Sequence, residues 1–433
     1  MDLNSMWRKL MKKYLPRIAD KLLEERLDAK GAVLIEGPKW CGKTTTAKEK
    51  AKSFISMDRP DMTSQYQQMA ELSPITLLEG EAPRLIDEWQ IAPKLWNAVR
   101  YEVDNRDEFG QFILTGSAVP NEFDDSMHTG TGRISRLLMR PMGLYESKDS
   151  SGEVSLKDLF EGQNISAMDE TGLEEIAFFI CRGGWPKAIG LDEKPALFQA
   201  IDYFNAAVST DISRVDSVKR DKEKAKRLLK SYARHVGTQS SLETIRQDML
   251  ANQSDTFDQV TLYSYLDALR KIFVIEDSPA WNPNLRSKTS IRTTDTRYLS
   301  DPSIATASLG IGPKDLLDDL NTMGFLFENL CVRDLRIYTD YLDGTVYHYR
   351  DRNGLECDAV IHLRNGAYGL VEVKLGGDKL IEEGAETLKN LASKIDTKNM
   401  SKPSFMMVLC AKAPFAYKRN DGVYVVPITA LRP

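Results

Sequence analysis

The stretch GPKWCGKT at residues 37–44 constrains the fold of this chain more than any other part of the sequence. The fixed positions of the pattern G-x-x-x-x-G-K-[ST] are filled by Gly37, Gly42, Lys43 and Thr44. The apolar stretch AVLIEG (32–37) predicts a strand before the motif, and the residues after it, to about residue 53, predict a helix. A loop between a strand and a helix N-terminus can surround phosphate groups with backbone N–H groups. The sequence therefore predicts a phosphate-binding loop in an α/β domain.

The loop carries the side chains that a nucleotide triphosphate requires. We expect Lys43 to neutralise the β and γ phosphates and the hydroxyl of Thr44 to bind Mg²⁺. The residues expected to contact ATP are Gly37, Pro38, Lys39, Trp40, Cys41, Gly42, Lys43, Thr44 and Thr45.

Two acidic residues at the end of a second apolar stretch, LIDE (85–88), support a hydrolytic site. We expect Asp87 to hold Mg²⁺ through water and Glu88 to polarise the attacking water. The alternative is a pair of solvated acids at a strand end. In a third stretch, FILTGS (112–117), Thr115 or Ser117 is placed to sense the γ phosphate, because the carboxyl ends of parallel strands face the ligand.

Residues 118–140 are rich in Gly, Asp, Ser and Arg and are expected to form a loop. Its arginines are Arg133, Arg136 and Arg140. One of them, with Arg133 as the first candidate, is expected to act as an arginine finger on a neighbouring subunit, which would make the protein a homo-oligomer. The alternative is a solvated basic loop.

Strands at 32–37, 54–57, 84–88 and 112–117 alternate with helical stretches. This alternation predicts an α/β domain with a parallel sheet covered on both faces. The chain of 433 residues is long enough for two to four domains. Residues 5–28 are expected to form a helix before the first strand.

Composition excludes several other classes of protein. The net charge of −5 gives no general attraction to nucleic acid. The five cysteines include no CxxC pair, which argues against a zinc ribbon and indicates a reducing compartment. The N-terminus lacks the apolar core of a signal peptide, and no run of 18 apolar residues occurs. We therefore expect a cytoplasmic protein that does not span a membrane.

The order of the motifs is more specific than any one of them. GPKWCGKTTT, LIDEWQ, FILTGSA, a GR pair and PMGLYE are followed by GGWP (183–186), FNAAVSTDI and TRYLSDPSIA. This series resembles the prokaryotic AAA+-type P-loop ATPases that carry a C-terminal domain of unknown function. The resemblance extends from about Tyr14 to Val426 and implies ATP and Mg²⁺ as ligands. Trp40 and Cys41 depart from the basic and small apolar residues that the family usually has before GK.

A second constellation lies near the C-terminus. Asp358 falls in the predicted strand CDAVIHL (357–363), and Glu372 and Lys374 share one face of YGLVEVKL (368–375). Glu328, on a helix expected to start at Asp315, is a fourth candidate. The set resembles the PD-(D/E)XK nuclease core, in which carboxylates bind Mg²⁺ and the lysine positions water. The alternatives are a structural ion pair between Glu372 and Lys374, or a nuclease-like fold without activity.

The middle of the chain is expected to be mostly helical from 203 to 269, with a β-hairpin at 270–300, which weakly suggests a winged helix. Basic residues fall on both parts: Arg227, Lys230 and Arg234 on a helix, and Arg286, Lys288 and Arg292 in the hairpin. They favour contact with DNA or RNA phosphates. The alternative is a solvated helix face.

Together these observations predict three domains: an AAA+-like P-loop ATPase at 1–200, a helical, winged-helix-like domain at 201–310, and a PD-(D/E)XK nuclease-like α/β domain at 311–433. We expect Mg²⁺-dependent ATP hydrolysis coupled to nucleic-acid binding or processing. The alternative function is an ATP-dependent switch that binds a protein partner and has an inactive C-terminal domain.

Overall fold

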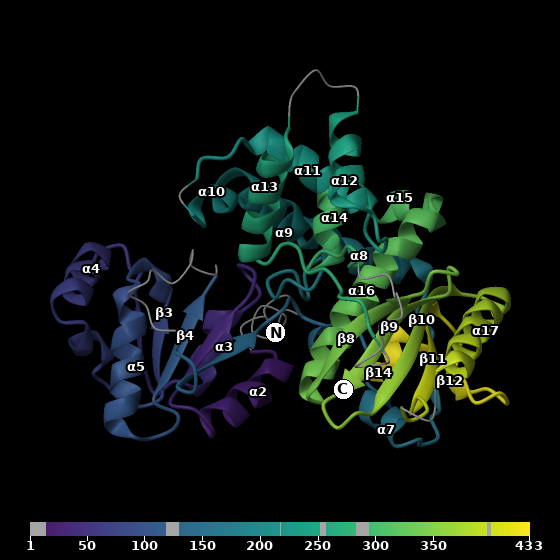
Figure 1. The fold of residues 1–433 in the computed structure, drawn as a ribbon, viewed down its shortest axis with the longest axis horizontal. Coiled ribbons are helices and arrows are strands. Elements are labelled where there is room, and N and C mark those ends of the chain that lie inside the picture. The colour runs from purple at the N-terminus through teal and green to yellow at the C-terminus, as the bar shows by residue number, and fades with distance from the viewer. Residues whose placement is uncertain (1–13, 118–129, 217, 252–256, 283–293, 396–399) are drawn as a thin grey trace, which may run out of the picture. The chain divides into compact units, whose positions relative to one another are not determined.

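The chain folds into two compact units that alternate along the sequence. A computed structural model describes residues 14–117, 130–216, 218–251, 257–282, 294–395 and 400–433 (Figure 1). The first unit comprises Met1–Pro141, Ser209–Arg220 and Asp267–Phe273. The second comprises Met142–Val208, Asp221–Leu266 and Val274–Pro433. The expected division into domains at 1–200, 201–310 and 311–433 stays a prediction.

The first unit is built on a five-stranded sheet in the order β2-β3-β4-β1-β5. Its strands are β1 (Ala32–Glu36), β2 (Ser53–Ser56), β3 (Arg84–Asp87), β4 (Phe112–Gly116) and β5 (Ile134–Leu138). Every pairing is parallel, so all the carboxyl ends meet at one edge. The structure thus has the parallel α/β sheet that the alternating pattern predicts.

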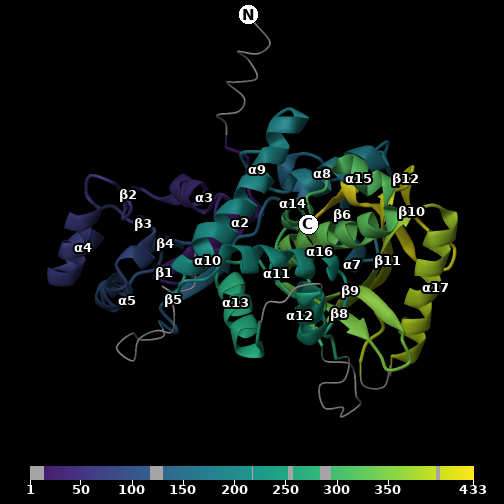
Figure 2. The same cartoon turned by 90° about the horizontal axis from the view of Figure 1, so that it is seen from above.

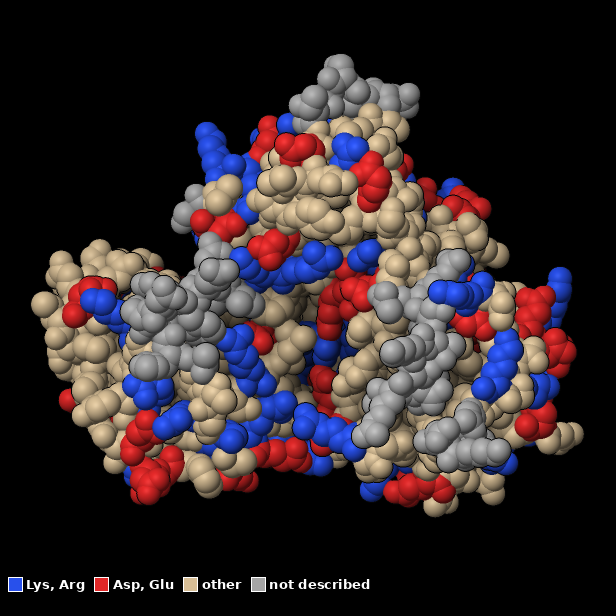
Figure 3. Space-filling model, in the orientation of Figure 1, with Lys and Arg blue, Asp and Glu red and all other residues tan. Residues whose placement is uncertain are grey.

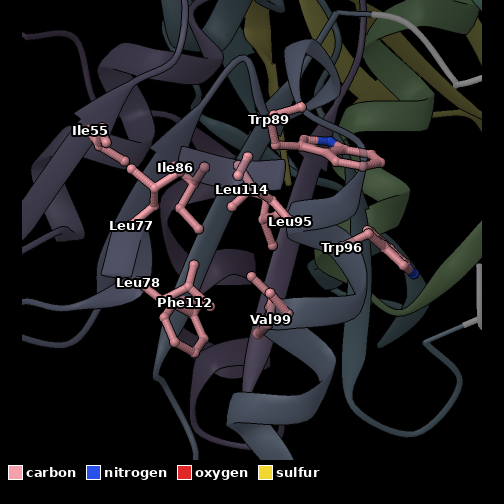
Figure 4. Close-up of a cluster of buried hydrophobic side chains, with 14 of the residues drawn as sticks. Ile55, Leu77, Leu78, Ile86, Trp89, Leu95, Trp96, Val99, Phe112 and Leu114 are labelled. Carbon is pink, nitrogen blue, oxygen red and sulfur yellow. The ribbon is translucent and has the colours of Figure 1, made fainter. Parts of the chain in front are cut away.

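The helices of the first unit are α2 (Ile18–Leu27), α3 (Lys43–Lys50), α4 (Thr63–Leu72), α5 (Lys94–Arg106) and α10 (Ile212–Arg214), with 3-10 turns η1 (Pro74–Leu78) and η2 (Trp89–Ile91). Of these helices, α2, α3 and α5 pack on the strands of the sheet. Figure 4 shows the apolar cluster between α5 and the sheet, where Leu114 and Phe112 of β4 lie beside Leu95 and Val99 of α5. This apolar layer holds β4 in place. Strand β4 in turn pairs with β3, and the site residues Asp87 and Glu88 lie at the end of β3.

Two expectations for the first unit were wrong in part. The helix expected at 5–28 starts only at Ile18, because Pro16 lacks an N–H and disfavours helical geometry in the residue before it; residues 1–13 lie outside the described part. The loop expected at 118–140 contains β5, which pairs with β1. The residues around β5 are rich in Gly and Arg and therefore predict a loop, but the pairing with β1 stabilises a strand. Residues 118–129 of that loop are also outside the described residues.

The second unit contains a mixed sheet in the order β7-β12-β13-β11-β10-β9-β8. Its strands are β7 (Ala167–Met168), β8 (Gly344–Arg350), β9 (Glu356–Leu363), β10 (Tyr368–Gly376), β11 (Phe405–Lys412), β12 (Phe415–Lys418) and β13 (Tyr424–Pro427); β6 (Val154–Ser155) and β14 (Leu431–Arg432) pair separately. Strands β8, β9 and β10 are antiparallel, and β10, β11 and β13 are parallel.

Two long helices flank this sheet. In Figures 1 and 2, α16 (Leu320–Tyr341) and α17 (Asp378–Lys394) lie on opposite faces. The other helices wholly within this unit are α6 (Leu144–Ser147), α7 (Leu156–Phe160), α8 (Leu173–Arg182), α9 (Glu193–Ala206), α11 (Lys222–Arg234), α12 (Leu242–Leu250), α14 (Pro302–Leu309), α15 (Pro313–Asp318) and the 3-10 turn η4 (Ile428–Ala430). Helix α13 (Gln259–Lys271) and the π turn η3 (Ala207–Asp211) begin in the second unit and end in the first.

The middle of the chain confirms the expected helices but not a regular hairpin. Segments 275–280 and 296–299 lie antiparallel without forming regular strands: they are joined by the isolated bridges Ile275–Leu299 and Ser278–Thr296, by the hydrogen bond from Glu276 N to Tyr298 O at 3.1 Å and by the Arg297–Asp277 ion pair at 2.9 Å. Residues 283–293, and with them Arg286, Lys288 and Arg292, lie outside the described part. The helix expected from Asp315 is divided in two, because the Asp319 side chain accepts a hydrogen bond from Thr322 N and begins a new helix. Within the described residues, no helix combines the length and apolarity needed to cross a bilayer.

Arg333 on α16 is the centre of a buried ionic network in the second unit. Its Nη1 donates to Asp301 Oδ2 and its Nε to Asp334 Oδ1, both at 2.8 Å. The three side chains are at most 2% exposed. Removing one partner from such a network leaves a buried charge without compensation, which is far more costly than losing an exposed pair.

The same network holds the loops that carry the PMGLYE and GGWP motifs. Leu144 N donates to Asp334 Oδ2 at 2.8 Å, and Gly184 N donates to Asp301 Oδ2 at 2.9 Å. A Cβ on Gly184 would lie 2.1 Å from the carbonyl oxygen of Met142, so only glycine fits there. These two motifs therefore have a structural role.

Replacing Arg333 with methionine tests the network. Methionine keeps most of the volume but leaves Asp301 and Asp334 buried without their cation, so we expect a loss of about 3–5 kcal/mol in the free energy of unfolding. Urea unfolding followed by circular dichroism measures it. The control is Arg364→Met, since Arg364 and Asp343 form a pair that is 81% and 72% exposed and should contribute little. Equal effects of the two substitutions would contradict the interpretation.

Candidate functional site

The loop between β1 and α3 has the conformation of a phosphate cradle. Gly37 has φ 147°, and a Cβ there would lie 2.1 Å from the carbonyl oxygen of Met139. Gly42 caps α3 at its N-terminus, where backbone N–H groups and the helix dipole favour an anion. Trp40 also has a positive φ of 65°, which is strained for a bulky residue. The side chain of Cys41 is buried and donates to Met139 O at 3.3 Å, while Thr45 is exposed.

The side chain of Lys43 folds back over the phosphate loop. It is 6% exposed, and its Nζ donates to the carbonyl oxygens of Gly37 (3.0 Å) and Pro38 (2.8 Å). The ammonium group is therefore held inside the curve of the loop, where a phosphate would need it.

Asp87 joins the loop to the end of β3. Its Oδ1 accepts a hydrogen bond from Thr44 Oγ1 at 2.8 Å and another from Thr115 Oγ1. The pairing of β3 with β4 sets Asp87 directly against Thr115. A hydroxyl and a carboxylate side by side are the oxygen ligands that Mg²⁺ prefers, and that ion is usually held by only one or two protein groups plus phosphate oxygens. The residues present therefore fit Mg²⁺.

Glu88 follows Asp87 in a left-handed conformation with φ 54°, which turns it out of the strand. Its carboxylate accepts a hydrogen bond from the amide of Gln90. Burial raises the pKa of Glu88, and the charge of Asp87 adds to the effect while Lys43 opposes it. A carboxylate with a raised pKa is a better proton acceptor in a hydrolytic site.

Two residues before the first strand, which belong to no sequence motif, also contact the site. Arg17, 7% exposed, donates to the carbonyl oxygens of Cys41 (2.7 Å) and Arg140 (2.9 Å). Tyr14 shares a hydrogen bond of 2.8 Å with Thr46 on α3. No sequence spacing links Arg17 and Tyr14 to the phosphate loop, because these contacts form only when the chain folds.

The arginines of the predicted finger have partners within the first unit. Arg133 forms an exposed ion pair with Asp104 at 2.8 Å, and Arg136 on β5 pairs with Glu36 at 3.4 Å. The backbone oxygen of Arg140 accepts from Arg17. The finger role therefore stays a prediction.

The C-terminal constellation is brought together in the second unit. Lys374 Nζ lies 2.8 Å from Glu372 Oε2 on β10, and Asp358 Oδ2 on β9 accepts from Val373 N at 2.7 Å. Glu328 on α16 accepts a hydrogen bond from the hydroxyl of Tyr298. Among the described residues, no group of three or more His, Cys, Asp or Glu side chains is arranged to hold a metal ion.

Burial and mutual repulsion perturb these carboxyl groups. Burial raises the pKa of Glu328 well above its usual range, and the charge of Asp358 adds to it. The same two causes raise the pKa of Glu372 to about 8, although Lys374 opposes them. Burial alone would lower the pKa of Lys374, but the charges of Asp358 and Glu372 raise it. Three acids thus share one lysine, an arrangement with a deficit of positive charge.

Two of the basic residues of α11 form ion pairs with acids. Arg234 is bonded to Asp248 at 2.9 Å, and Lys226 pairs with Glu223 at 3.2 Å. Lys230 is exposed and Arg227 is partly buried. On the face seen in Figure 3, Lys and Arg lie next to Asp and Glu in both units.

Three parts of the chain match known families. Residues 29–148 match the family described as AAA domain, residues 173–315 a domain of unknown function, DUF8612, and residues 323–431 another, DUF4143. Two relatives, the uncharacterized proteins Mb2031c of Mycobacterium bovis and Rv2008c of Mycobacterium tuberculosis, are each 24% identical over 365 residues, which are 83% of this chain and 73% of theirs. A similar solved structure, the Walker-type ATPase PABY2304 of Pyrococcus abyssi, is 18% identical, with a TM-score of 0.41, over 68% of this chain and 96% of that one.

The raised pKa of Glu372 predicts a pH dependence of stability. Its pKa is about 8 in the folded protein against 4.5 ordinarily, so the folded state holds a proton that the unfolded state releases. Stability should be greatest below about pH 4.5 with respect to this group and should fall as pH rises to about 8. Urea midpoints across that range should decline less in Glu372→Gln than in wild type. Glu383→Gln, at an exposed position of α17, is the control. Identical pH profiles for wild type and Glu372→Gln would contradict the assignment.

Proposed function

We propose that this chain, which carries an AAA-type P-loop ATPase domain at residues 29–148 and a DUF4143 domain at residues 323–431, binds and hydrolyses ATP with Mg²⁺. The observation that carries the proposal is the cluster around Asp87. Thr44 of the loop and Thr115 of β4 both donate to that carboxylate, and Glu88 follows it. Asp87 is 6% exposed and needs such donors in any case, but these two place hydroxyl and carboxylate oxygens from three elements together beside the phosphate loop.

The phosphate loop would bind ATP through its backbone N–H groups and the ammonium of Lys43. Lys43 would leave the carbonyl oxygens of Gly37 and Pro38 to neutralise the β and γ phosphates. Thr44 and Asp87 would hold Mg²⁺, which supplies positive charge for the phosphate oxygens. Asp87 and Thr115 are buried at the ends of β3 and β4, and electrostatic interactions are stronger in such surroundings than in bulk water.

Hydrolysis would proceed by attack of water on the γ phosphorus. Glu88 would accept a hydrogen bond, and then the proton, from that water. The water oxygen forms a bond to phosphorus while the bond from phosphorus to the β–γ bridging oxygen breaks, which yields ADP and phosphate. Gln90, which donates to Glu88, would orient the carboxylate.

Replacing Glu88 with glutamine separates binding from hydrolysis. Glutamine keeps the shape of the side chain but accepts protons poorly, so we expect ATP binding near the wild-type affinity and hydrolysis reduced by about a hundredfold or more. Equilibrium binding of a fluorescent ATP analogue and phosphate release measure the two quantities. Glu81→Gln, which removes an exposed acid before β3, is the control.

Lys43→Ala completes this experiment, since the loss of the ammonium group should weaken binding itself. Unchanged ATP affinity in Lys43→Ala would overturn the proposed nucleotide site. Wild-type turnover in Glu88→Gln would overturn the role of Glu88 alone.

A second function, metal-dependent cleavage of DNA or RNA in the second unit, is supported by the acids of β9, β10 and α16. The order α16, β8, β9, β10, α17, β11 also suits a nuclease-like α/β domain. Asp358, Glu372 and Glu328 are not arranged to hold a metal ion in this structure, so they would have to move closer together and lose their protons to bind a divalent cation, and Lys374 would then position water. A rival proposal is an ATP-dependent switch for a protein partner with an inactive C-terminal domain.

A cleavage assay distinguishes the two. We expect single- or double-stranded DNA or RNA to be cut by the wild-type protein with Mg²⁺ or Mn²⁺, and Glu372→Ala and Lys374→Ala to be inactive while their ATP turnover is retained. The exposed Lys379→Ala on α17 is the control. Absence of cleavage in both metals and all four substrates would favour the switch.

A further inference from the structure

The third residue of the phosphate loop is paired with an acid from a distant part of the chain. Lys39 Nζ lies 2.5 Å from Asp211 Oδ1, across 172 residues of sequence. Both belong to the first unit. Asp211 is the acid of the FNAAVSTDI stretch, which has no part in the nucleotide site as described so far.

The two partners differ in their access to solvent. The side chain of Lys39 is 38% exposed, but that of Asp211 is only 9% exposed. A buried carboxylate that loses its cation is strongly destabilised, whereas a lysine with a flexible stem can move to another anion at little cost. Breaking this ion pair is therefore more costly in free energy for Asp211 than for Lys39.

The segment around Asp211 is internally braced. Arg220 donates to both oxygens of Asp216 at 2.6 Å and to the carbonyl oxygen of Ile212 at 2.7 Å. Its side chain is 2% exposed. Asp211 itself ends the π turn η3, a local irregularity of the kind often found where helices carry function. A displacement of Asp211 would therefore move residues 211–216 as a body rather than one side chain.

We propose that Lys39 exchanges partners, binding Asp211 in the absence of nucleotide and a phosphate oxygen when ATP occupies the loop. The inference rests on the proposed ATP site. The phosphates of ATP bring several negative charges to the loop that holds Lys39, and they compete with a single carboxylate for its ammonium group. When they win, Asp211 loses its cation and residues 211–216 shift. Asp211 is a positioning residue in this scheme, because it acts on the nucleotide only through Lys39.

The exchange is reciprocal. If ATP weakens the Lys39–Asp211 pair, then anything that pulls residues 211–216 away from the loop must strengthen ATP binding by the same factor. The FNAAVSTDI stretch would in this way respond to nucleotide binding. Its distance from the phosphate motifs in sequence does not suggest this role.

A double-mutant cycle tests the exchange. Asp211→Asn removes the competing charge, so ATP should bind about tenfold more tightly, within the usual range of coupling between sites. Lys39→Gln should weaken binding, and in the Lys39→Gln background Asp211→Asn should have no further effect. Dissociation constants for the same fluorescent ATP analogue give all four values. Glu24→Gln is the matched control, since Glu24 pairs with Lys50 at the other end of α3 and its side chain is 54% exposed against 9% for Asp211.

Several outcomes would overturn the inference. Unchanged or weaker ATP binding by Asp211→Asn would do so, as would an equal effect of that substitution with and without Lys39. If Asp211→Asn melts below wild type, hydrogen exchange of the wild-type chain decides instead. ATP should then increase exchange in residues 209–216 in wild type but not in Lys39→Gln, and no increase in wild type would also refute the exchange. Binding that is insensitive to Lys43→Ala would instead refute the ATP site, and this inference with it.

Discussion

The parallel pairing of β1, β3 and β4 is the constraint on which the nucleotide site depends. One register sets Asp87 opposite Thr115, and another sets Ile35 opposite Thr115 on the other side of β4. The phosphate loop begins where β1 ends, so Thr44 can reach Asp87. A shift by one residue in either pairing would turn these side chains to the other face of the sheet. The apolar layer of α5 and β4 therefore stabilises the geometry of the site as well as the fold (Figure 4).

The parts of the site that follow local rules could be predicted from sequence, and the parts that arise from long-range contacts could not. The loop, Asp87 and Glu88 follow strands that their own apolar residues define, and their arrangement is as the motifs suggest. Arg17 contacts the loop from outside any motif, and Asp211 does so from the FNAAVSTDI stretch, whose sequence does not indicate Lys39 as its partner; only the folded chain brings the two residues there. Strand β5 was missed for the same reason, because its pairing with β1 outweighs a loop-like composition.

The second unit contains two buried charged clusters with opposite character. Around Arg333 the two acids share a strong cation and further backbone donors, so the cluster is satisfied and stabilises the loops around it. Burial raises the pKa of an acid in both clusters, but around Lys374 three acids share a single ammonium group, and the charge of Asp358 adds to burial in raising the pKa values of Glu328 and Glu372. Repulsion between buried acids does not stabilise a fold. The contrast supports a chemical role for the second cluster, and the motifs GGWP and PMGLYE are explained by the first.

The two units are interleaved along the chain, since Ser209–Arg220 and Asp267–Phe273 return to a unit that the chain left after Pro141. During synthesis on the ribosome, the first unit cannot be completed when its sheet emerges. The first unit can be completed only after residue 273 has been synthesised, and by then most of the helices of the middle region have been synthesised too. A fragment ending near residue 141 would keep every phosphate motif and still lack Asp211. Genetic exchange of the ATPase sheet between relatives would face the same obstacle, so the two units are expected to be inherited together.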